Sequence, residues 1–261
     1  MKPDPEKKIP KIRYLSRREM LGLTGSAVAA VTLVGCSSTS EQSGSSSSSE
    51  SASSTTSSSA STCTVKPQQT EGPYFVDEKL NRSDIRIDPT DGSIREGVPL
   101  ALAFNVSQNG SNSSCTPLAG AVVNVWHCDA LGRYSDVENN VGQKFLRGYQ
   151  VTDDSGSAQF QTIYPGWYQG RAVHIHFKIR TDPESEQGYE FTSQLYFDDA
   201  LTDQVHAQAP YAEKGERDLR NDDDGIFRDG GDELTLPLTE DGQGGYRATF
   251  DIALEPTYNQ T

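Results

Sequence analysis

Two histidines separated by a single residue, His174 and His176, are half of the four histidines in the 261-residue chain. Side chains alternate faces along an extended strand, so both imidazoles would point to the same side. In that position they could supply two ligands to one metal ion. The same spacing also fits an ordinary strand whose polar face meets water while Ile175, Phe177 and Ile179 pack inward. Spacing alone leaves both interpretations open.

The residues around this pair limit the kind of metal site that it could form. A cupin site would need a glutamate shortly downstream, yet residues 180–182 read Arg-Thr-Asp. A zinc site would need a third ligand such as Glu, Asp or Cys, and none is evident beside the pair. Immediately upstream lie two tyrosines, a tryptophan, a Pro-Gly turn and Arg171. These neighbours, rather than the spacing, discriminate between the interpretations.

The elements that must position these residues are predicted to be strands. In residues 244–254 apolar side chains alternate with mostly polar ones, and residues 120–128 read as a strand covered on both sides. Residues 149–163 read as two strands joined by a turn. Further strands are expected at residues 98–107, 174–180, 190–197 and 233–238. After the N-terminal region no long stretch has a helical period, so we expect an all-β fold, a β-sandwich of mixed or antiparallel sheets.

The N-terminus is predicted to be a targeting segment rather than part of the fold. Arg17 and Arg18 precede an apolar run at residues 20–34, which is short for a membrane span and fits a twin-arginine export signal. The run ends in Leu-Val-Gly-Cys, which resembles a bacterial lipoprotein signal acylated at Cys36; a chance cysteine after an ordinary signal is the alternative. We therefore expect residues 1–36 to be a signal, and the exported protein to be held by a lipid anchor on the membrane surface, on its periplasmic or cell-surface side.

The remainder of the chain divides into a linker and one domain. Residues 37–62 are Ser-rich and are expected to form a flexible linker. Residues 63–261 are long enough to bury one core. The net charge of −14 argues against nucleic acid as a partner. Three cysteines remain in this domain, and we favour a Cys63–Cys115 disulfide with Cys128 free and buried, although the connectivity does not follow from sequence.

Several separated blocks, in the same order, resemble the intradiol ring-cleavage dioxygenases, the family of protocatechuate and catechol dioxygenases. The blocks are TEGPYF at 70–75, WHCDALGRYSD at 126–136, TIYPGWY at 162–168 and RAVHIHFK at 171–178. The resemblance covers residues 63 to about 196 and, more loosely, the rest of the chain. It implies a mononuclear non-haem Fe(III) held by Tyr134, Tyr168, His174 and His176. Tyr164 precedes the Pro-Gly pair, where the family places no ligand.

This ligand set is chemically coherent. Fe(III) is a hard ion and phenolate oxygen is a hard donor. A tyrosine titrates near pKa ~10, so only a metal or a comparable charge would keep Tyr134 and Tyr168 ionised at neutral pH. The resemblance implies that a catechol-type aromatic diol binds as a dianion, that Tyr168 leaves the metal and takes up a substrate proton, and that O2 attacks the ring. The implied product is a cis,cis-muconate-type diacid.

The resemblance also assigns roles to residues that are not ligands. Arg171, three residues before His174, would stabilise negative charge on the substrate ring. Gly72, Pro73 and Tyr74 would form a wall of the substrate pocket. His127 is interpreted as a structural or supporting histidine, since the ligand set is full without it.

Other functions compete with this interpretation. A non-catalytic β-sandwich module could bind aromatic or sugar ligands at the surface, and a zinc hydrolase could use His174 and His176. The acidic residues 220–233 loosely suggest a calcium loop, but the first ligand position is Arg220, so a solvated loop is favoured. The sequence does not specify which catechol derivative is bound or the oligomeric state.

Overall fold

The computed structural model describes residues 63–110, 114–181 and 189–255. The predicted signal at residues 1–36, with Cys36, and the predicted linker at residues 37–62 lie outside the described residues. Within the described ranges, no helix has both the length and the apolar character needed to span a membrane.

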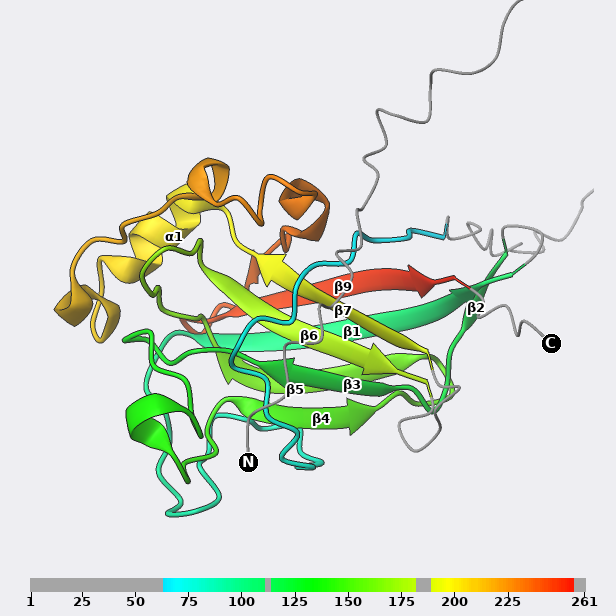
Figure 1. Ribbon diagram of the computed structural model, residues 1–261, viewed down its shortest axis with the longest axis horizontal. Helices are drawn as coiled ribbons and strands as arrows, with labels where there is room; N and C mark the ends of the chain where they lie inside the picture. The colour runs from blue at the N-terminus through cyan, green and yellow to red at the C-terminus, as the bar shows by residue number, and fades with distance from the viewer. Residues whose placement is uncertain (1–62, 111–113, 182–188, 256–261) are drawn as a thin grey trace, which may run out of the picture. The chain divides into compact units, whose positions relative to one another are not determined.

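Two β-sheets dominate the described residues and confirm the predicted all-β sandwich (Figure 1). One sheet has the order β4-β3-β6-β7 and is antiparallel throughout. In the other sheet, β1 pairs with β9 in parallel and with β5 and β2 in antiparallel orientation. The short strand β8 pairs with β9 in antiparallel orientation. The four-stranded sheet comprises β3 (Val122–Trp126), β4 (Arg147–Val151), β6 (His174–Arg180) and β7 (Glu190–Tyr196). The five-stranded sheet comprises β1 (Pro99–Asn109), β2 (Cys115–Pro117), β5 (Ser157–Ile163), β8 (Thr239–Glu240) and β9 (Tyr246–Leu254).

The core lies between the two sheets, where apolar residues at every second position of each strand meet. The ring of Phe177 from β6 lies 5.4 Å from that of Phe104 on β1 and 5.4 Å from that of Phe250 on β9, measured between ring centroids. Ile175 and Ile179 are fully buried on the same face of β6 as Phe177. The alternation read from the sequence therefore gives the correct inner face of β6, and leaves its histidines on the outer face of the sheet.

A covering segment, residues 67–82, crosses this outer face from β7 to β4. The main-chain N–H of Gln69 donates to the carbonyl of Thr192 on β7, and Arg82 N–H donates to the carbonyl of Tyr149 on β4. Midway, the ring of Phe75 packs edge-on against Trp126 of β3, at 4.8 Å. Figure 1 shows this segment, in cyan, passing over the sheet. The polar face of β6 is therefore buried instead of meeting water.

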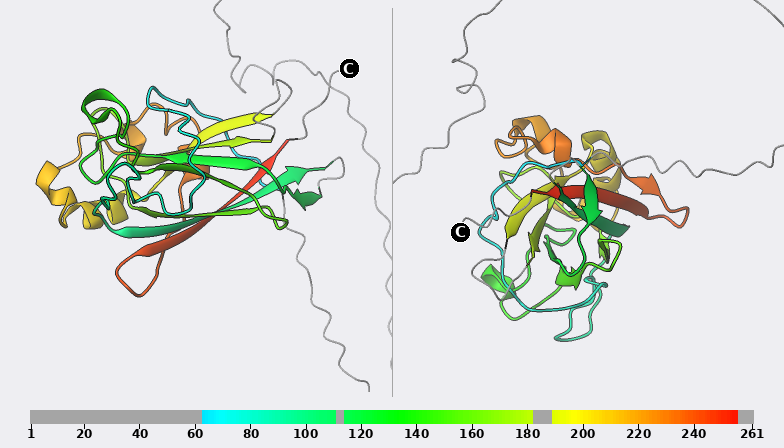
Figure 2. Two further views of the ribbon diagram at one scale, coloured as in Figure 1. Left: turned by 90° about the horizontal axis from the view of Figure 1, so that it is seen from below. Right: turned by 90° about the vertical axis from the view of Figure 1, so that its right-hand side faces the viewer.

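The helical segments gather at one end of the sandwich (Figures 1 and 2). They are α1 (Asp199–His206) and the 3-10 turns η1 (Glu138–Asn140), η2 (Tyr211–Lys214), η3 (Asn221–Asp223) and η4 (Gly231–Leu234). The sequence did not predict α1, because two turns are too few to display a clear helical period. Its N-terminus is capped by Asp198, whose side chain accepts from the N–H of Leu201 at 2.8 Å.

Two of the sequence expectations differ in detail. The turn between β4 and β5 does not close a hairpin, since the two strands belong to different sheets. The strand expected at residues 233–238 is wrong: Leu234 ends η4, and Thr235 makes only an isolated bridge to Tyr196. Leu234 and Leu236 are buried, so the apolar alternation is real, but Pro237 has no N–H and cannot continue a ladder of hydrogen bonds.

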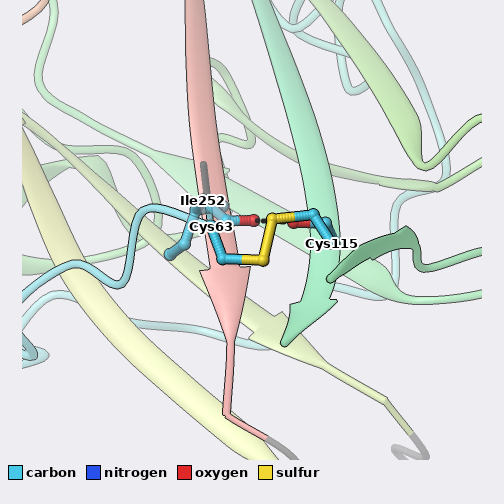
Figure 3. Close-up of a disulfide and its surroundings, with 4 residues drawn as sticks. Cys63, Cys115 and Ile252 are labelled. Atoms are coloured by element: carbon cyan, nitrogen blue, oxygen red, sulfur yellow. Dashed lines mark hydrogen bonds between the residues drawn. A yellow bond between two sulfur atoms is a disulfide. The ribbon is translucent and has the colours of Figure 1, made fainter. Parts of the chain in front are cut away.

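Cys63 and Cys115 form a disulfide, the pairing that the sequence favoured, and Cys128 is free and buried. Figure 3 shows the bridge beside Ile252 of β9. The next residue of the chain, Thr64, accepts a hydrogen bond from the N–H of Ala253, also on β9. The disulfide thus ties the start of the domain to the five-stranded sheet, opposite the side that carries the histidines.

Candidate metal and active site

Four side chains form a row across the outer face of the four-stranded sheet. Gln194 on β7, His176 on β6, Trp126 on β3 and Arg147 on β4 are successive cross-strand partners. The imidazole of His176 stacks on the indole of Trp126 with 5.0 Å between centroids and 6° between planes. All four residues are at most 2 % exposed. The stack on Trp126 fixes the orientation of the His176 ring.

The two histidines point toward each other at their Nε2 atoms, which lie 2.9 Å apart. His174 Nδ1 is 2.6 Å from the carbonyl oxygen of Ala172. A carbonyl oxygen can only accept, so Nδ1 carries the proton and Nε2 keeps a free lone pair. A main-chain partner on the remote nitrogen is a common arrangement for metal-binding histidines. His174 is therefore oriented to use Nε2 as a ligand.

Two loops, each with a glycine two residues before a tyrosine, bring Tyr134 and Tyr168 to this point. Gly132 has φ +78°, and a Cβ there would lie 2.1 Å from the carbonyl oxygen of Trp167. A Cβ on Gly166 would lie 2.3 Å from the carbonyl oxygen of Ala130. Only glycine permits both close approaches. The two loops consequently pack backbone against backbone, which places the two tyrosines side by side.

The phenols complete a cluster of four donors. Tyr168 Oη lies 3.3 Å from His174 Nε2, and the rings of Tyr134 and Tyr168 are 5.6 Å apart between centroids. Tyr134 Oη is buried and interacts with the Tyr168 hydroxyl, but it forms no hydrogen bond of normal geometry among the described residues. Buried hydroxyl groups are normally hydrogen-bonded. A buried phenol oxygen that lacks a normal hydrogen bond beside two imidazoles fits a site in which a cation is the missing partner.

Burial keeps all four donors neutral in the absence of a cation. It lowers the pKa of His174 to about 3. Burial, then the repulsion that a protonated His174 would exert, and then the charge of Arg171 lower the pKa of His176 well below its ordinary value. Burial also raises the pKa of Tyr168 to about 12 and that of Tyr134 well above its ordinary value. Neutral imidazoles are the ligand form of histidine. The phenols would need a strongly charged metal to ionise at neutral pH.

Arg171 lies at the edge of this cluster and is held from two sides. Its Nε donates to Asp224 Oδ2 at 2.9 Å, and its terminal nitrogen donates to Gln194 Oε1 at 2.5 Å. Burial alone would lower the pKa of Arg171, but the neighbouring Tyr168 and Asp224 raise it. The guanidinium therefore presents a fixed positive charge close to Tyr168.

Sequence reasoning missed Asp224 and Gln194. Asp224 is 2 % exposed; its Oδ2 also accepts from the N–H of Ala172, and its Oδ1 accepts from the N–H of Ile226. The interpretation of the acidic stretch as a solvated loop is therefore wrong at this residue. Gln194 lies opposite His176 in register, so the strand alternation could have placed it on the same face. Nothing in the sequence around Asp224 indicates its partner, which is 53 residues away.

The residues predicted to form the substrate wall lie in the covering segment, against the cluster. Gly72 has φ +73°, and a Cβ there would be 3.2 Å from Cε1 of His176. The ring of Tyr74 stacks on Tyr134 at 4.6 Å and meets Tyr168 edge-on at 6.0 Å. Pro73 is exposed at the turn between them. This part of the segment is anchored by Glu71, which pairs with the buried Lys178 of β6.

Other residues noted in the sequence lie around the cluster or away from it. His127 is fully buried and its Nε2 hydrogen-bonds Thr162 Oγ1 at 2.6 Å, a supporting position. Cys128 packs with Trp126 and Tyr134, and burial raises the pKa of its thiol to about 12. Trp167 donates to the carbonyl of Gly215, 3.1 Å away, outside the cluster. His206 is the last residue of α1.

The fold and the site together define a β-sandwich protein with two histidines and two tyrosines converging on the outer face of one sheet. A family model described as "Dioxygenase" matches residues 70–256. Among solved structures, an intradiol ring-cleavage dioxygenase from Tetranychus urticae is 28 % identical in sequence with a TM-score of 0.64, covering 75 % of this chain and 96 % of that one. The chain belongs to the intradiol ring-cleavage dioxygenase family.

Curated relatives match over shorter lengths. Catechol 1,2-dioxygenase of Candida albicans is 27 % identical over 204 residues, which cover 70 % of this chain and 60 % of that protein. Chlorocatechol 1,2-dioxygenase of Pseudomonas putida is 35 % identical over 100 residues, covering 31 % of this chain and 36 % of that protein. The chain thus matches between about a third and three fifths of the length of these relatives.

Proposed function

We propose that this protein is an Fe(III)-dependent intradiol dioxygenase that cleaves a catechol-type aromatic diol with O2 to a cis,cis-muconate-type diacid. Its relatives are named for catechol, chlorocatechol and protocatechuate. The observation that carries the proposal is the convergence of four donors from three segments of the chain: the facing Nε2 atoms of His174 and His176, the nearby Oη of Tyr168, and the buried Oη of Tyr134, which lacks a normal hydrogen bond.

The donor set fits ferric iron better than zinc. Phenolate oxygens are hard donors that match a hard trivalent cation, and two of them offset most of its charge. Zinc sites use Cys, His, Asp or Glu, and the described residues contain no group of three such side chains arranged to hold a metal. A zinc hydrolase built on His174 and His176 would therefore lack its third ligand. Bound Fe(III) would chelate the deprotonated diol and accept electron density from its ring, which would activate the ring toward O2.

The chain's own residues would then bind, orient and deprotonate the substrate. Tyr168 is half-buried, whereas Tyr134 is 4 % exposed, so Tyr168 is the phenol with room to move when a diol arrives. Its pKa of about 12 in the absence of metal makes a released Tyr168 phenolate a strong base for a diol proton. Arg171, held by Asp224 and Gln194, would stabilise negative charge on the bound ring.

The colour of the iron-loaded protein tests this proposal. Tyrosinate bound to Fe(III) gives a visible charge-transfer band, and zinc gives none. We expect the wild type to be burgundy, to consume O2 with catechol and to form a muconate. Tyr134→Phe and Tyr168→Phe should each shift or abolish the band and reduce turnover.

Tyr164→Phe is the matched control. Tyr164 is fully buried and lies four residues before Tyr168, but its hydroxyl hydrogen-bonds Thr202 at 2.7 Å, outside the cluster. This variant should keep the band and the activity. A band that survives both Tyr134→Phe and Tyr168→Phe would show that the ligand assignment is wrong, and a colourless iron-loaded wild type would refute the ferric site.

We also propose that the catalytic domain, residues 63–261, is exported and tethered to a membrane surface by an acylated Cys36 and the Ser-rich linker. The support for this is the N-terminal sequence alone. Incorporation of labelled palmitate into the wild type, and its absence in Cys36→Ala, would be the expected result. Equal labelling of both would overturn the assignment of Cys36.

A further inference from the structure

Arg147 is a buried arginine whose side chain binds two main-chain carbonyls and a serine hydroxyl rather than an acid. It is 2 % exposed, on β4, at the end of the row that begins with Gln194. Its Nε donates to Ser135 Oγ at 2.9 Å, one terminal nitrogen donates to the Ser135 carbonyl at 2.6 Å, and the other donates to the Tyr74 carbonyl at 2.6 Å. A buried charge is costly unless it is well satisfied. Burial accordingly lowers the pKa of Arg147.

The partners of Arg147 belong to the two segments that meet at the candidate site. Ser135 directly follows Tyr134, and Tyr74 is part of the predicted substrate wall. The rings of these two tyrosines stack, with 4.6 Å between centroids and 30° between planes. A guanidinium group is planar and rigid, and it donates in fixed directions. A single planar group therefore sets the position of the wall relative to the loop that carries Tyr134.

We propose that Arg147 is a positioning residue that holds Tyr74 against Tyr134, and so fixes both the orientation of the Tyr134 phenol and the wall of the substrate pocket. Arg147 would be the counterpart of Gln194 at the opposite end of the row: Gln194 holds Arg171, and Arg147 holds the tyrosine pair. The consequence for a bound diol rests on the proposed function. The tyrosine stack itself belongs to the protein without metal.

The first experiment uses metal-free protein with ring-labelled tyrosine. Stacked rings shift each other's NMR resonances upfield, and the Tyr74 signal can be assigned by its absence in Tyr74→Phe. We expect Arg147→Met to lose this shift. Arg147→Lys keeps the charge but cannot hold both carbonyls, so its shift should fall between those of Arg147→Met and the wild type.

Arg217→Met is the matched control. The Arg217 side chain is 6 % exposed and pairs with Asp199 and Asp203 of α1, away from both tyrosines. The Arg217→Met variant should lower the midpoint of thermal unfolding without moving the Tyr74 signal. A Tyr74 signal that stays at its wild-type position in Arg147→Met, or that moves equally in Arg217→Met, would overturn the proposal. If Arg147→Met does not fold, Arg147→Lys is used instead: a partial loss of the Tyr74 shift supports the proposal, and an unchanged shift overturns it.

The second experiment separates this proposal from the ferric site. In iron-loaded protein, Arg147→Lys should shift the charge-transfer band and raise the KM for catechol about tenfold, with a smaller change in kcat. An unchanged band and KM in Arg147→Lys would contradict the positioning role. A colourless wild type would refute the iron proposal, while the tyrosine stack would still be measured by NMR.

Discussion

The outer faces of the two sheets have the same kind of sequence but opposite environments. On β9, Arg247, Thr249 and Asp251 point outward and are exposed. On β6, His174, His176 and Lys178 hold the equivalent outward positions and are 2, 1 and 5 % exposed. The difference comes from the covering segment, which crosses only the four-stranded sheet. Alternation of polar and apolar residues therefore identifies the two faces of a strand, but it does not show which polar face is covered.

Burying a polar face has a cost that each residue must offset. Lys178 pairs with Glu71 and Glu190, and Arg147 is satisfied by carbonyl oxygens. Several buried polar atoms of this face form no hydrogen bond of normal geometry among the described residues: His176 Nδ1, Trp126 Nε1 and Tyr134 Oη at the site, and Asn124 Nδ2 and Arg180 Nε farther along the strands. Unsatisfied buried groups lower stability. These atoms are spread along the face, so the stability cost of covering it is not confined to the site.

The largest expected effect is on the free energy of unfolding, and it is tested by comparing one residue from each outer face. Trp126→Ala on β3 should lower the free energy of unfolding by about 3–5 kcal/mol, because it leaves a cavity between His176 and Phe75. Thr249→Ala on β9 should change it by less than about 0.5 kcal/mol. Urea unfolding of the metal-free proteins measures both. Similar losses for the two variants would mean that the covering segment does not bury the face as described.

The second prediction concerns pH and His127, which links the two sheets through Thr162. Burial lowers the pKa of His127 from its ordinary value of 6.5 to about 4. Between these values the unfolded chain binds the additional proton, so stability is full above pH 6.5 and decreases as the pH falls toward 4. Proton binding at His127 alone accounts for a loss of about 3 kcal/mol in the free energy of unfolding over this pH range. His127→Gln should reduce the slope of unfolding free energy against pH between pH 4 and 6.5 by the equivalent of about one proton. An unchanged slope would contradict the assignment of this pH dependence to His127.

The smallest expected effect is on kcat/KM, and it is tested by comparing two aspartates near Arg171. Asp224→Asn removes the charge that holds the guanidinium and should lower kcat/KM about tenfold, equivalent to about 1.4 kcal/mol. Asp218→Asn, at an exposed carboxylate that accepts from the N–H of Gly170, should have little effect. Steady-state assays with catechol decide this. Equal losses would indicate a general electrostatic effect rather than positioning of Arg171.

Much of the fold was predictable because it depends on local patterns. Period-two alternation located β1, β3, β6, β7 and β9, and the inner face of β6 was correct. The strand expected at residues 233–238 failed because Pro237 interrupts hydrogen bonding, and α1 was missed because it is short. The types of the candidate ligands, His174, His176, Tyr134 and Tyr168, could also be read from sequence blocks.

The sequence by itself predicted which residues would bind a metal, because each of them lies in a short block that resembles a block of the intradiol dioxygenase family. Only the tertiary structure decided that the histidine face is buried, that Asp224 and Gln194 hold Arg171, and that Arg147 joins Tyr74 to Ser135. These contacts connect segments between 12 and 73 residues apart. No local pattern encodes such pairs, since they arise only when strands and loops distant in the chain pack on one sheet.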